Sequence, residues 1–245
     1  MLKEELISYS KPKSISAEAY RALRTNLEFS MSGEGARSIL ITSSHVSEGK
    51  SSVAANLATV FAMQNKKTVL VDADMRRGVQ AKRFEIQNNN GLSNYLANMI
   101  VKEKEFVKRT EIPNLYVITS GPVPPNPAEL LSSSRMKEML DGLKEDFDVI
   151  VVDGAPVLPV TDSVILSAIV DRVVVVASYG ETHKEELKSV KAALENAGAN
   201  IAGVVLNKVD AKGKGYHRYS KYGKYGNGYY ASYYGNEKES KEREN

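Results

Sequence analysis

The sequence of 245 residues contains no cysteine, which excludes a disulfide framework and any metal site built on thiolates. Long apolar runs are absent too, since no stretch approaches the roughly 18 residues of a membrane-spanning helix. The opening segment MLKEELISYSKPKS lacks the apolar core of a secretory leader. The three histidines, His45, His183 and His217, are scattered and form no recognisable triad, so we expect them on the surface or in loops. These absences predict a cytoplasmic protein.

Charge and tyrosine are distributed unevenly along the chain. The formal net charge is +3, but residues 211–245 alone hold eight Lys or Arg against four Glu. Eight of the 13 tyrosines also lie in this end of the chain, which has almost no aliphatic residues. Such a composition buries too little apolar surface to offset the entropy of ordering, so we expect a mobile tail. We predict three parts: an N-terminal segment (1–33), a folded domain (34–210) and a tail (211–245).

Short β-branched runs alternate with helical patterns through the folded part. Because several runs are almost continuously apolar, they fit strands that are buried on both faces of a parallel sheet. The predicted fold class is therefore α/β: a doubly wound, mainly parallel sheet of the P-loop NTPase type, with ligands bound beyond the carboxyl ends of the strands. The predicted strands are SILITS (38–43), TVLVDAD (68–74), LYVITS (115–120), DVIVVD (148–153), RVVVVAS (172–178) and IAGVVLN (201–207).

Capping signals mark the starts of three helices. Ser16 precedes an apolar pattern that predicts a peripheral helix ahead of the first core strand. Asn126 and Pro127 fit the cap and first residue of a helix at AELL. Thr182 and Glu185 have the spacing of a capping box before EELKSVKAALENA.

The first predicted strand runs through SHVSEGKSS into an apolar helical segment. Strand, GKS and helix form the context of a P-loop, in which backbone N–H groups hold phosphate, Lys50 reaches the β and γ phosphates, and the Ser51 hydroxyl ligates Mg²⁺. Ser44 stands where the usual first glycine of this motif would be. We predict that ATP is bound by Ser47, Glu48, Gly49, Lys50, Ser51 and Ser52.

Carboxylates end two other predicted strands. Asp72 and Asp74 end VLVDAD, with Arg76 directly after them, and Asp153 ends DVIVVD. At this edge of a parallel sheet the first pair could support a nucleophile or a metal-bound water, or could merely cap a loop. Asp153 fits an acid that holds Mg²⁺ through water. Asn207, at the end of the last strand, could contact the adenine or could serve a turn.

Taken together, these motifs resemble the bacterial tyrosine kinases of capsule and exopolysaccharide synthesis, in their Gram-positive cytoplasmic form. The resemblance covers most of the chain and rests on segments that occur in the family's order. They are EAYRALRTNL, ITSSHVSEGKSS, VLVDADMRR, GPVPPNPAELL, VIVVDGAPVLPVTDS, GVVLNK and the terminal tyrosine cluster. The chain departs from the family's usual Pro-Gly at Val46-Ser47 and from its usual Thr-Pro at Gly154-Ala155.

The resemblance implies that the γ-phosphoryl group of ATP passes to tyrosine, with autophosphorylation of the tail. It assigns Lys50 to ATP, gives Ser51, Asp72, Asp74 and Asp153 to the metal, and leaves Asp72 or Asp74 as the base, with Asp72 favoured. Arg76 joins this set as a further catalytic candidate. The implied phosphorylation sites are Tyr216, Tyr219, Tyr222, Tyr225, Tyr229, Tyr230, Tyr233 and Tyr234.

The same resemblance implies assembly and partners. Glu18, Arg21 and Arg24 match the family's Glu-x-x-Arg-x-x-Arg helix, which assembles subunits into a ring. From the residues alone, these three could equally be a solvated charge pair on a helix surface. The implied partners are a membrane-anchored activator of the polysaccharide co-polymerase type, which supplies a cytoplasmic activating segment at the inner face of the membrane, and a cognate tyrosine phosphatase.

Two other classes of function compete with this interpretation. A partitioning or division-site ATPase of the MinD/ParA type shares the scaffold, but its signature lysine is replaced here by His45. A nucleic-acid-binding module could use the tyrosines and basic residues of the tail to stack on bases and neutralise phosphates. The tyrosine cluster favours the kinase, and no nucleic-acid partner is expected.

Overall fold

The computed structural model describes residues 6–31, 37–99 and 106–209. The chain divides into two compact units, residues 1–207 and 208–245, and the first is described here. The tail tyrosines lie outside the described residues.

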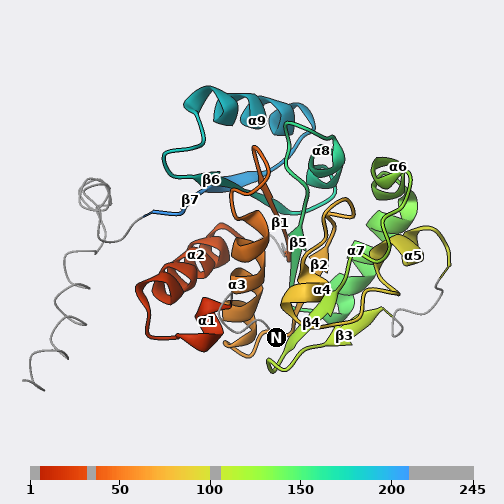
Figure 1. Cartoon of the computed structure of the whole chain (residues 1–245), viewed down its shortest axis with the longest axis horizontal. Helices are drawn as coiled ribbons and strands as arrows, with labels where there is room; N and C mark the ends of the chain where they lie inside the picture. The colour runs from red at the N-terminus through yellow and green to blue at the C-terminus, as the bar shows by residue number, and fades with distance from the viewer. Residues whose placement is uncertain (1–5, 32–36, 100–105, 210–245) are drawn as a thin grey trace, which may run out of the picture. The chain divides into compact units, whose positions relative to one another are not determined.

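A seven-stranded sheet forms the centre of the first unit, in the order β3-β4-β2-β5-β1-β6-β7 (Figure 1). All pairs are parallel except β3 with β4, which confirms the predicted fold class. The strands are β1 (Ser38–Ser43), β2 (Thr68–Asp72), β3 (Val107–Arg109), β4 (Leu115–Ile118), β5 (Val149–Asp153), β6 (Arg172–Ser178) and β7 (Ile201–Asn207).

The six predicted strands are all present, with corrections at their ends. β2 stops at Asp72 because the chain turns there: the Asp74 carboxylate accepts a hydrogen bond from the backbone N–H of Arg77 at 3.0 Å. β4 ends at Ile118 rather than at residue 120, and β5 begins at Val149. The edge strand β3 was not predicted, because three half-exposed or exposed residues carry no alternating pattern.

Helices cover both faces of the sheet (Figure 1). Alternating β1 side chains reach the two layers, since Ile39 and Ile41 pack on one side and Leu40 on the other. The first side carries α1 (Ile7–Ser10), α2 (Ile15–Met31) and α3 (Lys50–Ala62). The second carries α5 (Leu92–Leu96), α6 (Pro127–Leu131), α7 (Ser134–Asp146), α8 (Asp162–Ser167) and α9 (Lys184–Asn196). The remaining helix, α4 (Gln80–Arg83), follows β2.

Two predicted helix caps were wrong by one or two residues. The Ser14 hydroxyl, not that of Ser16, accepts the free N–H of Ala17 at 3.1 Å at the start of α2. At α9 the N-cap is His183, whose N–H donates to Glu186 at 2.8 Å. Thr182 is unavailable as a cap because its hydroxyl accepts the N–H of Ser178 at 2.7 Å.

The predicted start of α6 is close to the observed one, with Asn126 at the N-cap and Pro127 as the first residue. Among the helices that the structure describes, none combines the length and apolarity that crossing a lipid bilayer needs.

Candidate nucleotide-binding site

The loop between β1 and α3 has the backbone form of a phosphate-binding loop. Gly49 has a φ of +96° and Ser47 a φ of +65°, so the chain turns tightly just before the first residue of α3. A Cβ atom on Gly49 would lie 2.0 Å from Nδ2 of Asn207, so only glycine fits. The helix that follows presents its N-terminus, with unpaired N–H groups and a positive dipole end, to this loop.

The loop is held from two neighbouring elements. Nδ2 of Asn207, the last residue of β7, donates to the backbone carbonyl of Glu48 at 2.9 Å. The buried Glu48 carboxylate accepts the N–H of His45 at 2.9 Å and the hydroxyl of Thr182. The Glu48 side chain therefore shapes the loop from within, and the predicted site residue Asn207 supports its backbone.

Lys50 lies among the strand-end carboxylates. Its ammonium is 2.8 Å from Oδ2 of Asp74, 3.1 Å from the Ser51 hydroxyl and 3.5 Å from Oδ1 of Asp153. Burial alone would lower the pKa of Lys50, but the charges of Asp153 and Asp74 outweigh it and raise that pKa. Lys50 therefore stays cationic at the point where the helix begins.

Both oxygens of the fully buried Asp153 are used. Oδ1 accepts the Ser51 hydroxyl at 3.1 Å, and Oδ2 accepts Nε2 of Gln80 at 2.8 Å. Asp72 lies beside it on the neighbouring strand, in direct register. Its Oδ2 accepts the backbone N–H of Gln80 at 3.0 Å, whereas its buried Oδ1 has no partner. Burial, and next the charge of Asp153, raise the pKa of Asp72 well above its ordinary value.

These oxygens fit a phosphate-bound divalent cation. The Ser51 hydroxyl and the Asp153 carboxylate lie together, and hard oxygen ligands are those that Mg²⁺ prefers. In the described part of the chain, no three His, Asp or Glu side chains form a complete metal cluster. In proteins Mg²⁺ keeps several waters and takes one or two protein oxygens plus phosphate oxygens, a role that the Ser51 hydroxyl and the Asp153 carboxylate can fill.

Arg76 points to a different partner. Its Nε and Nη2 atoms donate to the two oxygens of Asp162 at 2.8 and 3.0 Å, and Asp162 is the fully buried first residue of α8. The guanidinium thus ties the loop after β2 to α8. Asp162 was not singled out from the sequence, because an acidic residue at the start of a helix is usually explained by its favourable interaction with the helix dipole.

Two residues of α4 were also missed. Gln80 contacts Asp72, Asp153 and the carbonyl of Ser51, and Arg83 donates to that carbonyl at 3.0 Å and to the Ser52 hydroxyl at 3.0 Å. No local motif marks them, since an amide and a guanidinium on a four-residue helix have no characteristic spacing.

The three predicted assembly residues have different environments on α2. Glu18 and Arg21 form an ion pair of 2.6 Å with both side chains partly exposed. Arg24 is buried and donates to the carbonyl of Val60 on α3 at 3.2 Å. Only the first two are presented on the surface of α2.

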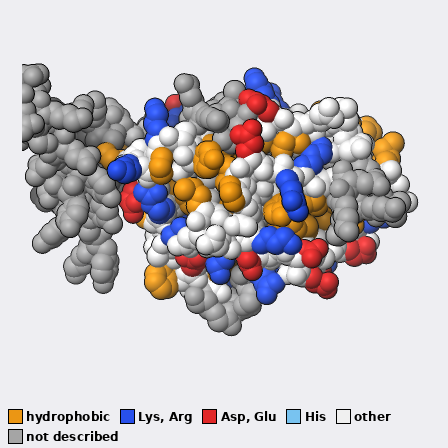
Figure 2. Space-filling view, turned by 90° about the horizontal axis from the view of Figure 1, so that it is seen from below, with side chains coloured by type: hydrophobic (Ala, Val, Ile, Leu, Met, Phe, Trp, Pro, Cys, Tyr) orange, Lys and Arg blue, Asp and Glu red, His pale blue; other side chains and the backbone are white. Residues whose placement is uncertain are grey.

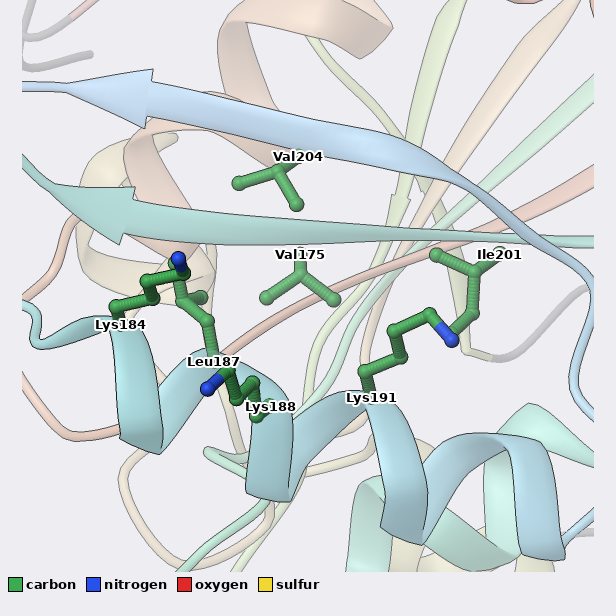
Figure 3. Close-up of a pocket in the computed structure, with 7 residues that line it drawn as sticks. All are labelled: Val175, Lys184, Leu187, Lys188, Lys191, Ile201 and Val204. Atoms are coloured by element: carbon green, nitrogen blue, oxygen red, sulfur yellow. The ribbon is translucent and has the colours of Figure 1, made fainter.

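A separate hollow of about 280 Å³ lies between α9 and the strands β6 and β7 (Figure 3). Its walls are apolar side chains of β6, β7 and α9, overhung by lysine side chains of α9. None of the predicted site residues lines it. The lining residues are Val175, Lys184, Leu187, Lys188, Lys191, Ile201 and Val204. The alkyl parts of the lysines shield an apolar edge, a common way to protect an edge strand.

The molecular face in Figure 2 mixes basic, acidic and apolar side chains over the described residues.

Comparisons with known proteins agree with this geometry. A sequence profile of the AAA domain family matches residues 36–198. The chain is 40% identical to tyrosine-protein kinase YwqD of Bacillus subtilis, over 92% of each chain. It is 39% identical to putative tyrosine-protein kinase CapB of Staphylococcus aureus, over 83% of this chain and 89% of that one.

Two solved structures place the fold. The chimerical protein CapA2B2 superposes with a TM-score of 0.80 at 39% identity, over 84% of this chain and 90% of its own. The cell division ATPase MinD of Pyrococcus furiosus superposes with a TM-score of 0.61 at 24% identity, over 71% and 74% of the two chains. The second likeness is one of fold alone.

Proposed function

Because the chain belongs to the bacterial tyrosine kinases of capsule and exopolysaccharide synthesis, we propose that it uses Mg²⁺ and ATP to phosphorylate the tyrosines of its own C-terminal segment. The observation that carries the proposal is the convergence of three strand ends on one loop: Lys50 lies within 3.5 Å of both Asp74 and Asp153. A lysine and a hydroxyl at a helix N-terminus, surrounded by carboxylates, are the parts that phosphoryl transfer from a metal nucleotide needs.

The P-loop binds the phosphates of ATP. The N–H groups at the start of α3 and the Lys50 ammonium would hold the phosphate oxygens. Ser47, Glu48, Gly49, Ser51 and Ser52 supply the backbone of the loop. When bound, Mg²⁺ neutralises phosphate charge, and the Ser51 hydroxyl and the Asp153 carboxylate are the groups that would hold it.

Asp72 is the proton acceptor in this proposal. Both oxygens of Asp74 are used, by Lys50 and by the N–H of Arg77, and both oxygens of Asp153 are used as well. Oδ1 of Asp72 alone makes no hydrogen bond. Burial and the neighbouring Asp153 raise its pKa, which makes the carboxylate a stronger proton acceptor. Because this oxygen is buried, the proton of the tyrosine hydroxyl would pass to it through one water.

Regulation and assembly follow the family. Tyr216 to Tyr234 would be the modified cluster, Glu18 and Arg21 would take part in a ring of subunits, and a phosphatase would reverse the modification. A membrane-anchored activator would supply a cytoplasmic segment that completes the site and brings the kinase to the inner face of the membrane. The match to the chimerical protein CapA2B2 supports a partner of this kind.

Mass spectrometry of the purified chain with Mg-ATP tests the function. We expect phosphate on the C-terminal tyrosines, increased by a candidate activator peptide, and none for Lys50→Met. Lys66→Met is the matched control, because Lys66 is exposed on the surface. Release of ADP without phosphotyrosine in the wild type, with the peptide present, would contradict the kinase and favour an ATPase switch of the MinD type.

A further inference from the structure

Gln80, which no sequence motif singles out, contacts three residues of the candidate site. Its side-chain Nε2 donates to Oδ2 of Asp153 at 2.8 Å and to the carbonyl of Ser51 at 3.0 Å. Its backbone N–H donates to Oδ2 of Asp72 at 3.0 Å. One fully buried residue of α4 thus connects the ends of β2 and β5 with the start of α3.

The orientation of this amide is determined by its neighbours. Oε1 of Gln80 accepts Nη1 of Arg83 at 3.1 Å, so Nε2 must face Asp153. The same Arg83 nitrogen donates to the carbonyl of Ser51, and Nη2 donates to the Ser52 hydroxyl. Both donors and the acceptor of the amide are therefore satisfied, as a buried polar group requires.

Only an amide suits this position. A carboxylate of the same shape would place lone pairs against Oδ2 of Asp153 and add a third buried negative charge beside Asp72. An apolar side chain would leave that oxygen without its donor, and the carboxylate would be free to turn about its χ2 torsion, which is broad.

We propose that Gln80 is a positioning residue for the cation-dependent step, which holds Asp153 and Ser51 in the arrangement that binds a nucleotide-bound divalent cation. The proposal rests on the function proposed above. Because Gln80 donates to Oδ2 of Asp153, the other oxygen of that carboxylate, Oδ1, faces the Ser51 hydroxyl. Oδ1 of Asp153 and Oγ of Ser51 lie 3.1 Å apart. Groups that orient a metal-holding carboxylate typically change metal affinity by about 10–100-fold when removed.

The contribution of Gln80 is separable from that of the P-loop itself. The backbone N–H groups that face phosphate belong to residues 47–52, and Gln80 contacts this stretch only at the carbonyl of Ser51. Nucleotide binding without a cation should therefore be nearly indifferent to the Gln80 amide, whereas binding with a cation should depend on it.

Titration of a fluorescent ATP analogue into the full chain, in EDTA and then at rising Mg²⁺, separates the two contributions. For Gln80→Ala we expect cation-free affinity within about twofold of wild type and a Mg²⁺ midpoint about tenfold higher. The Mg²⁺ dependence of tyrosine phosphorylation should shift by the same factor. Gln87→Ala is the matched control, since Gln87 lies in the same connection with an exposed side chain.

Gln80→Asn is a second variant, to be used if Gln80→Ala folds poorly. It keeps a polar amide but shortens the side chain by one methylene, so we expect the same increase in the Mg²⁺ midpoint. A Mg²⁺ midpoint equal to that of Gln87→Ala would overturn the positioning role. So would an equal loss of affinity with and without Mg²⁺, which would make Gln80 a support of the loop. If the affinity of the wild type for the ATP analogue did not depend on Mg²⁺, both the proposed function and the positioning role of Gln80 would be overturned.

Discussion

The amide of Asn207 donates to the backbone carbonyl of Glu48, so the edge strand β7 holds the phosphate-binding loop across a long stretch of sequence. The same Nδ2 atom occupies the space that a side chain on Gly49 would need. The conformation of the loop therefore depends on the last residue of the sheet as well as on its own glycine.

We expect Asn207→Ala to weaken nucleotide binding by about five- to tenfold, because one internal hydrogen bond contributes about 1 kcal/mol. Calorimetric titration with ATP measures the change. Asn89→Ala, at an exposed position after α4, should bind like the wild type. Unchanged affinity in Asn207→Ala would mean that the loop keeps its conformation without this hydrogen bond.

Asp72→Asn should separate stability from activity. The substitution replaces a fully buried acid beside Asp153 with a neutral amide, so we expect a thermal midpoint about 2–4 °C higher than that of the wild type. Tyrosine phosphorylation should fall by about 10²–10⁴-fold with little loss of nucleotide affinity. Melting curves, binding titrations and phosphorylation rates on one preparation give all three values.

Asp74→Asn is the informative comparison, because it removes the ion pair of 2.8 Å with Lys50 and should lower the thermal midpoint. A thermal midpoint of Asp72→Asn below that of Asp74→Asn would contradict this prediction. It would mean that the Asp72 carboxyl group stabilises the folded protein.

Asp171 makes stability depend on acid pH. Burial would raise its pKa, but hydrogen bonds from the N–H groups of Arg37 and Ser38, the Ser38 hydroxyl and Lys144 lower the pKa to about 2. A depressed pKa stabilises the fold above the unfolded pKa of about 4 and loses this contribution as the pH falls through about 2.

Asp171→Asn should lower the free energy of unfolding by about 1–2 kcal/mol at pH 7, allowing for partial solvent screening. The difference from wild type should shrink below pH 4. Urea unfolding at pH 7 and pH 3 measures both values, with the exposed Asp141→Asn as control. If the difference in the free energy of unfolding were larger at pH 3 than at pH 7, the pKa of Asp171 would not be lowered in the folded protein.

The α2 residues should divide into an assembly pair and a packing residue. Glu18→Ala with Arg21→Ala should lower the particle mass in light scattering while leaving the thermal midpoint nearly unchanged, since partly exposed pairs contribute about 0–1 kcal/mol. Arg24→Ala should lower the midpoint, because its side chain packs on α3. An oligomer that persists without Glu18 and Arg21 would exclude the pair from assembly.

Much of the fold and the centre of the site could be predicted from the sequence. The strands are apolar on both faces, and because parallel strands end at one edge of the sheet, the sequence predicts that Asp72, Asp153 and Lys50 lie near one another. These predictions succeeded because each depends on a local pattern plus one general rule of topology.

The remaining features depend on contacts between distant segments. Thr182 has the sequence of a cap, but its hydroxyl bonds Ser178 and Glu48, so a tertiary partner displaced the local role. Gln80 and Arg76 act through residues far along the chain, Asp153 and Asp162, and neither pairing has a local signature. Arg24 reads as a surface charge until α2 is packed on α3.

The strand order also has a consequence for the synthesis of the chain. β1 pairs with β5 on one side and β6 on the other, and both are translated long after it. An emerging nascent chain therefore holds a strand that is buried in the folded protein, with two open edges until β5 leaves the ribosome and one open edge until β6 does. Fragments that stop before β5 should aggregate rather than fold, and stalled translation in this interval should create a demand for chaperones.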